Sequence, residues 1–188
     1  MADAPDIIDD KNKKFALLIA ILALLLAFSE LGGSNADNEA IEANVEVANL
    51  WSFFQAKTIR RTDTQLSIQT MQIQLLAAPP GQKEAMEKQI AEWREAIARY
   101  DSDPKPNDGR KELAARATAA EENRKILKAK GDIFDISSAL LQVGIVLASA
   151  TIITGIAMLA WLAIGLGVIG AVLMAFALWA PLTLAAIM

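Results

Sequence analysis

Two pairs of glutamates come nearest, by type and spacing, to the residues that acid–base chemistry requires. They are Glu92 with Glu95 and Glu121 with Glu122. Paired carboxylates act as general acid and general base when their surroundings separate their two pKa values. Glu92 and Glu95 each have a cation four residues away on the same predicted helix, and ion pairs on a solvated helix face account for them without catalysis. We therefore expect no catalytic residue among these glutamates.

The chain of 188 residues contains no cysteine and no histidine. This composition excludes disulfides, thiolate and imidazole metal ligands, and nucleophiles activated by a histidine. The side chain best suited to proton transfer near neutral pH is also lacking. We expect a protein that is not an enzyme and that has no catalytic, metal-binding or cofactor-binding residues.

One glycine pattern, GLGVIG from Gly165 to Gly170, matches the GxGxxG fingerprint of dinucleotide-binding folds. That fingerprint works only between a strand and a helix, with an acidic residue about 20 positions further on. No acidic residue follows it in this chain, and the surrounding sequence is apolar. The match is therefore not interpreted as a nucleotide site, and no small-molecule substrate is evident.

Apolar residues make up 54% of the chain and are concentrated in two segments. Residues 136–188 contain no Asp, Glu, Lys or Arg, and this segment is long enough to cross a bilayer about twice, since one crossing takes roughly 20 residues. The other segment begins at Phe15 and is short but sufficient for one crossing. The sequence predicts an integral membrane protein with transmembrane helices at 15–31, 136–158 and 161–179.

The segment KNKKFALLIAILALLLAF, which begins at Lys11, also resembles a secretory signal, because it has a basic start and an apolar run. The candidate cleavage site at Ser34 to Ala36 is poor, which favours an uncleaved anchor. Cations precede this span and none follows it until Lys57, so the positive-inside rule places residues 1–14 in the cytoplasm. Cations before the second span argue the opposite, but the first span usually dominates. We expect a bacterial inner membrane location with the following polar region in the periplasm.

Residues 32–135 form that polar region, and its Gly and Pro residues lie mainly where helices should end. GGSN is predicted to end the first span, PPGQ forms a turn, and DSDPKPNDG forms a longer loop. The predicted soluble helices are about 35–78, 82–101 and 109–135, the last running directly into the second span. The first would be about 66 Å long and the other two about 70 Å together, so they can close into an antiparallel arm. The expected fold class is an all-α membrane protein with three transmembrane helices and this coiled-coil-like arm between the first and second.

The first helix of the arm has apolar or small residues at helical spacing, with polar residues in the remaining positions of the same face. The apolar or small positions are Ile41, Val45, Ala48, Ile59, Leu66, Ile73 and Leu76, and the polar ones are Ser52, Gln55, Thr62 and Gln69. Buried Gln can fix the register between helices, and solvated Gln is the alternative. Both interpretations stay open at this point.

The stretch WSFFQAKTIRR, beginning at Trp51, is the most aromatic part of this polar region. Trp51 and Phe54 share a face one turn long, and we expect them to pack on the return helix around residues 113–120, where alanines leave room for large rings. Contact with a neighbouring subunit is the alternative. The expected helix-packing or subunit-interface residues here are Trp51, Phe53, Phe54, Gln55 and Ile59.

Small residues recur every four positions in the last span, at Ala163, Gly167, Ala171 and Ala175. Because small residues let helix backbones approach closely in lipid, we expect this row to mark a helix contact within the hairpin or between subunits. Trp161 and Trp179 are about 27 Å apart along a helix, which suits one indole at each membrane interface. Gly155 is the best turn candidate, and residues 180–188 are expected to form an apolar tail along the membrane surface.

The run ANLWSFFQAKTIRR, preceded by a short span ending in LGG and by the acidic NADNEAIEANVE, resembles the uncharacterised bacterial membrane family catalogued as domain of unknown function four-three-three-seven. Its most specific element is the block W-x-F-[FY]-Q-A-K-x-I-R, matched by Trp51, Phe53, Phe54, Gln55, Ala56, Lys57, Ile59 and Arg60. The resemblance covers nearly the whole chain and implies no activity, substrate or cofactor. Basic residues, which the resemblance implies in the turn between the last two spans, are missing from TGIAMLAW.

The function expected from these patterns is a non-enzymatic oligomeric scaffold or accessory interaction subunit, in contact with membrane lipid. It would form a homo-oligomer or belong to a larger membrane complex through its arm and its small-residue transmembrane faces. The alternative is a subunit of a transport or channel assembly, although residues 136–188 have only Ser, Thr and Gln142 as polar side chains. No nucleic-acid partner is expected, because residues 34–132 contain 15 cations and 16 acids.

Overall fold

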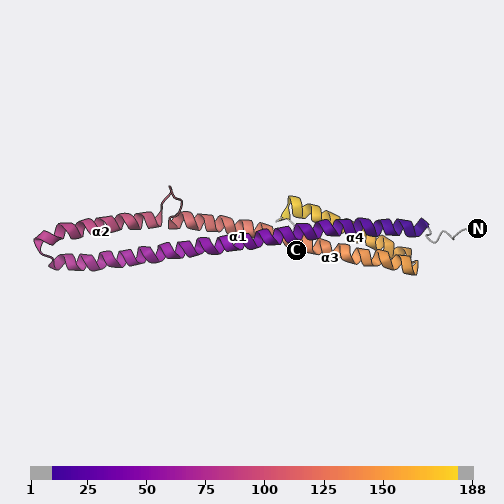
Figure 1. The fold of residues 1–188 in the computed structure, drawn as a ribbon, viewed down its shortest axis with the longest axis horizontal. Helices are drawn as coiled ribbons and strands as arrows, with labels where there is room; N and C mark the ends of the chain where they lie inside the picture. The colour runs from indigo at the N-terminus through magenta and orange to yellow at the C-terminus, as the bar shows by residue number, and fades with distance from the viewer. Residues whose placement is uncertain (1–9, 182–188) are drawn as a thin grey trace, which may run out of the picture. The chain divides into compact units, whose positions relative to one another are not determined.

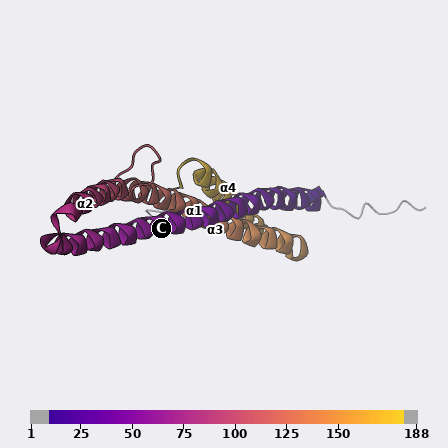
Figure 2. The same ribbon diagram turned by 60° about the vertical axis from the view of Figure 1, so that its left-hand side comes forward.

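The protein is all-α. The computed structural model describes residues 10–181, which form four α-helices (Figures 1 and 2). They are α1 (Asp10–Ala77), α2 (Pro80–Asp101), α3 (Arg110–Thr154) and α4 (Ala157–Trp179). Proline precedes and begins α2, and Gly155, with a positive φ of 71°, separates α3 from α4 at the predicted turn. Residues 1–9 of the predicted N-terminal segment and 182–188 of the predicted tail lie outside the described residues.

The predicted start of a new helix near Asn35 is wrong, because α1 continues without interruption through GGSN. The two glycines instead lie where α3 approaches closely. A Cβ atom on Gly32 would come within 2.6 Å of Phe134 Cζ, and one on Gly33 within 3.2 Å of Phe134 Cβ. Ser29, one turn earlier, donates a 3.0 Å hydrogen bond from Oγ to the carbonyl oxygen of Phe134. Glycine at these positions makes room for an aromatic ring rather than ending the helix.

Three of these helices are long and apolar enough to cross a membrane: α1 from Lys13 onward, α3 and α4. The prediction of three membrane spans is confirmed at this level of length and composition. The predicted helix 109–135 runs without a break into the predicted span 136–158 as one helix, α3, as the absence of a proline between them indicates. This helix ends at Thr154, before the predicted end of the span, and residues 157 and 158 already belong to α4.

The chain divides into two compact units. Unit 1 consists of residues 1–41 and 124–188, and unit 2 of residues 42–123. In unit 1, α1, α3 and α4 pack through small residues: buried Leu22 and Leu141 share a cluster with Ala163 of α4. Ser137 of α3 donates a 2.8 Å hydrogen bond from Oγ to the carbonyl oxygen of Gly170 on α4. The helix contacts of unit 1 therefore combine small side chains with hydroxyls bonded to the backbone.

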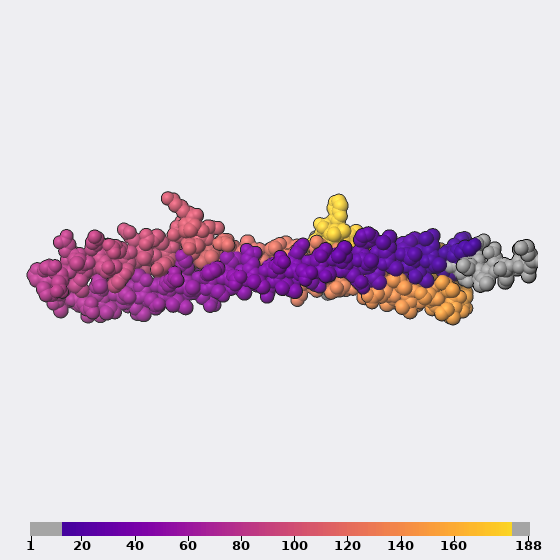
Figure 3. Space-filling model, viewed as in Figure 1, coloured from indigo at the N-terminus to yellow at the C-terminus, as the bar shows by residue number. Residues whose placement is uncertain are grey.

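In unit 2, α1 runs in the opposite direction to α2 and the start of α3. Contacts join Trp51 to Glu121, Lys57 to Asp108 and Arg61 to Asp101, so that later residues on one side meet earlier residues on the other. The apolar and aromatic residues that recur at steps of four and three along α2 are all buried or half-buried: Met86, Ile90, Trp93, Ile97 and Tyr100. The side chains of α1, in purple, form much of the visible surface of this unit (Figure 3). Unit 2 is thus held together by contacts between residues far apart in the sequence.

Substitution of Gly32 by alanine is expected to destabilise the protein by about 1–3 kcal/mol, because the new methyl group would overlap the ring of the buried Phe134. The measurement is the thermal midpoint of the detergent-solubilised chain, followed by circular dichroism. Gly165→Ala is the matched control, since a Cβ atom there meets nothing within 4 Å, and this variant should be as stable as the parent or slightly more so. Equal midpoints for both variants would contradict the role given to Gly32.

Candidate functional site

Trp51 and Phe54 lie one turn apart on α1 and pack against the start of α3. Their rings meet edge to face, with 5.5 Å between the ring centroids and an angle of 81° between the planes. Both contact the buried cluster that includes Leu113 and Ala117 of α3. Trp51 Nε1 donates a 2.9 Å hydrogen bond to Glu121 Oε1, which satisfies the only polar atom of the indole. These aromatic contacts lie within one chain, and Glu121 serves as a hydrogen-bond acceptor.

Arg110, the first residue of α3, connects the aromatic pair to a charged network. Its guanidinium lies 5.1 Å from the centroid of the Phe54 ring, within the range of a cation–π interaction. Its Nε donates to Thr58 Oγ1 at 3.0 Å, and its Nη1 donates to Asp101 Oδ1 at 2.7 Å. The other oxygen of Asp101 accepts a 2.9 Å hydrogen bond from Arg61 Nε. One carboxylate at the end of α2 therefore holds an arginine of α1 and an arginine of α3 together.

The protonation of Asp101 is set by opposing effects. Burial by itself raises its pKa, but the hydrogen bonds and positive charges of Arg61 and Arg110 together hold the pKa below its ordinary value of 3.8. The carboxylate is therefore ionised at neutral pH and pairs with both guanidiniums. Stability that this pairing contributes is fully present above pH 3.8 and is lost as the pH falls through the lowered pKa.

A second ion pair joins α1 to the loop between α2 and α3. Lys57 Nζ lies 2.9 Å from Asp108 Oδ2, and the same ammonium lies 5.8 Å from the centroid of the Tyr100 ring. The other oxygen of Asp108 is buried and has no hydrogen-bond partner. Asn107, next to it, has a positive φ of 57°, which asparagine tolerates better than most residues. The loop thus presents Asp108 to α1 directly after this turn.

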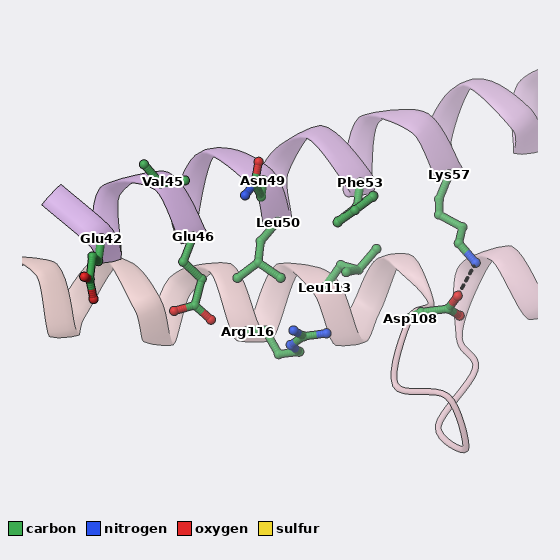
Figure 4. Close-up of a pocket in the computed structure, with 10 residues that line it drawn as sticks. All are labelled: Glu42, Val45, Glu46, Asn49, Leu50, Phe53, Lys57, Asp108, Leu113 and Arg116. Carbon is green, nitrogen blue, oxygen red and sulfur yellow. Dashed lines mark hydrogen bonds and ion pairs between the residues drawn. The ribbon is translucent and has the colours of Figure 1, made fainter. Parts of the chain in front are cut away.

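A groove of about 490 Å³ runs between α1 and α3 beside these contacts (Figure 4). Its apolar centre is formed by Leu50 and Phe53 of α1 and by Leu113 of α3, and Figure 4 shows these three side chains between the two helices. Acidic side chains line one part of the groove, and cationic side chains and the loop aspartate line another: Glu42, Glu46, Lys57, Asp108 and Arg116. Predicted interface residue Phe53 lies here with its ring 61% exposed.

Gln55 and Ile59 lie on a different face of α1, which no described part of the chain covers. Spacings of three and four residues in the sequence indicate this face, and all of its members within unit 2 are exposed. We call it the exposed heptad face: Val45, Ala48, Ser52, Gln55, Ile59, Thr62, Leu66, Gln69, Ile73 and Leu76. Exposure of its large apolar side chains ranges from 54% at Val45 to 85% at Leu76. The polar positions of this face are therefore solvated within the single chain.

The predicted row of small residues on α4 is only partly a packing face. Ala163 and Gly167 are buried, whereas Ala171 is half-buried and Ala175 is exposed. Steps of four residues turn about 40° around a helix each time, so such a row drifts away from a fixed neighbour. The buried residues of α4 are instead separated by three, four, three and seven positions: Ala160, Ala163, Gly167, Gly170 and Ala177. A Cβ atom on Gly167 would overlap a methyl group of Leu22, so glycine lets α1 approach α4 there.

The two predicted interface tryptophans, Trp161 and Trp179, are the fifth and the last residue of α4 and are both exposed. Neither indole is covered by another described helix of unit 1. This exposure leaves both side chains accessible to lipid, since Trp favours membrane–water interfaces.

A polar hollow of about 580 Å³ between α1 and α3 in unit 1 was not predicted from the sequence. Glu30, Asp37 and Asp135 contribute its carboxylates, and Gln142 donates a 3.3 Å hydrogen bond from Nε2 to Glu30 Oε1. Among the residues that the structure describes, no three carboxylates converge as metal ligands would. The acidic side chains are spread along the hollow rather than gathered at a point.

The ion pairs of unit 2 connect its helices and the loop between them: Asp101 pairs with two arginines, and Asp108 with Lys57. The aromatic residues were predicted from the sequence, but their partners Arg110 and Glu121 were not. Asp101 and Asp108, the partners of Arg61 and Lys57, were not predicted either. The predicted helix lengths could have indicated these ion pairs, because an antiparallel alignment of the arm brings the 101–109 loop near Lys57 and Arg61.

Comparison with known families adds one finding. The family model described as Domain of unknown function (DUF4337) matches residues 11–180, and the chain belongs to this family. No curated protein and no solved structure matches the chain. The resemblance noted from the WSFFQAKTIRR stretch is therefore confirmed at the level of the family.

Replacement of Asp101 by asparagine is expected to lower stability at neutral pH by about 0.5–1 kcal/mol, as is usual for partly exposed ion pairs. The difference from the parent should shrink as the pH falls below 3.8, because the parent carboxylate then becomes protonated and loses the same interactions. Thermal unfolding of the full-length chain in detergent across this pH range measures the effect. Asp103→Asn, in the neighbouring loop and without an arginine partner in the network, should show no such pH dependence. A pH-independent loss in Asp101→Asn would rule out the ionic explanation.

Proposed function

We propose that this member of the DUF4337 family is a non-enzymatic membrane protein that acts as an oligomeric scaffold or accessory interaction subunit. The observation that carries the proposal is the exposed heptad face of α1. Monomeric soluble surfaces rarely expose a long continuous apolar stripe, and such stripes are typical of protein interaction sites. Here large apolar residues recur at Ile59, Leu66 and Ile73, one heptad apart, and each is more than half exposed.

The site chemistry supports a structural role. The paired charges of unit 2 are placed so that they fix α1 against the 101–109 loop and the start of α3. Trp51 and Phe54, the first and fourth residues of the block that carries the family resemblance, pack on α3 and hold that arrangement together. Because one side of α1 is held by packing, the opposite side has a fixed conformation before a partner binds. Such preorganisation lowers the entropic cost of binding at a helix surface.

Transport or channel function is the second candidate, and the buried polar groups of unit 1 give it less support. Ser29 and Ser137 each donate to a backbone carbonyl of a neighbouring helix, and Thr151 donates to its own helix. Hydroxyls used in this way bind helices together instead of lining a hydrated path. The scaffold proposal accounts for them without a substrate.

We further propose that the three apolar helices are transmembrane spans and that unit 2 belongs to an extramembrane arm. The bias of lysines toward the start of α1 supports a cytoplasmic N-terminus and a periplasmic arm in a bacterial inner membrane. Trp161 and Trp179, exposed on α4, suit the two interfaces of such a span.

Native mass spectrometry after gentle detergent extraction tests the scaffold proposal. The expected result is a species heavier than the 20.2 kDa chain, either a multiple of that mass or a complex with a co-purifying protein. Extraction in two detergents of different harshness serves as the control for dissociation. A chain that runs alone at 20.2 kDa in the mildest conditions, with nothing bound, would refute the proposal.

Limited proteolysis tests the orientation. The 101–109 loop has exposed Pro, Lys and Asn residues between two helices, which a protease of broad specificity such as proteinase K can cut. Proteinase K added to intact spheroplasts should cut this loop if the arm is periplasmic. Cleavage only after the membrane is opened would place the arm in the cytoplasm, and cutting of the purified chain under the same conditions is the control.

A further inference from the structure

We propose that the exposed heptad face of α1 binds a second copy of this chain, with the two α1 helices parallel and in register. This inference rests on the proposed scaffold function and names the partner. Its basis is the composition of the face and of the positions that flank it, together with the contacts that occupy the opposite side of α1.

Within unit 2, α1 has two stripes of heptad spacing on opposite sides. The stripe that faces α2 and α3 is buried or half-buried at every position: Ala43, Val47, Leu50, Phe54, Lys57, Arg61, Thr64, Ile68, Met71 and Leu75. Each of these positions comes two residues before or after a member of the exposed heptad face, a rotation of about 200° around the helix. The contacts inside the chain therefore leave the exposed heptad face open to an approaching helix.

The exposed heptad face contains no charged residue, so it has no charges that would attract an oppositely charged partner. In heptad notation, the positions called a are occupied by Val45, Ser52, Ile59, Leu66 and Ile73. Each position called d follows three residues later. The flanking e and g positions from Asn44 to Ala77 contain one charged residue, Asp63. When two copies lie parallel, no e residue in this range faces a g residue of like charge. An identical helix thus meets no electrostatic penalty.

Three polar d positions give the pairing its register. Gln55, Thr62 and Gln69 are spaced one heptad apart and are exposed in the single chain. A glutamine side chain has both donors and an acceptor, so two copies in register can satisfy each other's amides across the interface. A shift of one helix by four residues would place the amides of Gln55 and Gln69 against Ile59 and Ile73 and leave them unsatisfied. The β-branched residues that predominate among the apolar a positions favour two helices over three or four.

Two further properties suit a second copy. All copies that insert into one membrane with the same topology start α1 from the same side, so their α1 helices run parallel. Between Asn44 and Ala77, 18 residues at a, d, e and g positions are exposed, while the g residues Trp51 and Thr58 contact α3. This number is close to the roughly 20–30 residues that a stable interface uses on each side. The face is about 46 Å long from Val45 to Leu76.

Disulfide cross-linking tests the pairing directly, because the natural chain has no cysteine. Gln69→Cys places a single thiol at a d position, where two parallel copies in register bring the thiols within bonding distance. The purified full-length chain in mild detergent, treated with copper phenanthroline, should give a product of twice the 20.2 kDa chain mass that reducing agent reverses. Gln74→Cys is the matched control, since Gln74 is equally exposed but lies on the outer side of a parallel pair.

The outcomes separate this inference from the proposed function. A dimer cross-linked at position 69 and not at position 74 supports the parallel pair. Absence of cross-linking at position 69, or equal cross-linking at both positions, overturns it. If the native mass shows an assembly but the thiol at 69 links to a different protein, the scaffold function stands and the identity of the partner proposed here is wrong.

A charge placed on the face gives a second measurement that does not depend on thiol chemistry. Leu66→Asp should raise the dissociation constant of the dimer at least about tenfold, because two carboxylates would be buried against each other. Leu66 is exposed in the single chain, so helix content by circular dichroism should stay unchanged. Gln74→Asp, with the same new charge outside the face, should leave the dissociation constant within about twofold of the parent. An unchanged constant in Leu66→Asp would overturn the inference.

Discussion

The structure of unit 2 depends on the way α1 is held along one side. Trp51, Phe54 and their neighbours press one stripe of α1 against the alanine-rich start of α3, and the indole is anchored to Glu121. Without this contact α1 would be a long helix with apolar residues on two sides and no fixed orientation. Because one side is held, the other is defined as a continuous surface from Val45 to Leu76.

Charged residues reinforce this arrangement at the place where α2 gives way to α3. Asp101 and Asp108 flank the loop, and each binds a cation of α1. Such pairs contribute little free energy each when they are partly exposed, but they penalise a shift of α1 along α3, because a shift by one turn would separate both pairs. The network and the aromatic pair therefore determine the register of the helices, while apolar burial supplies most of the stability.

In unit 1, small residues allow the helices to pack closely. Gly32 and Gly33 admit the ring of Phe134, and Gly167 admits Leu22, so that helices of apolar composition come close enough for hydroxyls to reach backbone carbonyls. In lipid, where burial of apolar surface does not by itself drive helices together, close packing and such hydrogen bonds are the available sources of affinity.

The sequence by itself determined the all-α class, the positions of three apolar helices, the turn at Gly155 and the loop before α3, since these follow from local composition and from the conformations that Gly and Pro allow. It misjudged Gly32 and Gly33, because a glycine pair that ends a helix and one that admits a ring look alike without the ring. It also predicts a row of small contact residues on α4, of which the single chain fully buries only Ala163 and Gly167, because steps of four residues do not keep to one side of a helix.

Only the tertiary structure decided which side of α1 the chain itself covers. Both stripes have the same period, and periodicity reports that a helix has an apolar face but not what lies against it. That choice is made by contacts such as Trp51 with Glu121 and Arg61 with Asp101, between residues 70 and 40 positions apart. The exposed heptad face was visible as a pattern in the sequence, but its exposure depends on those distant contacts.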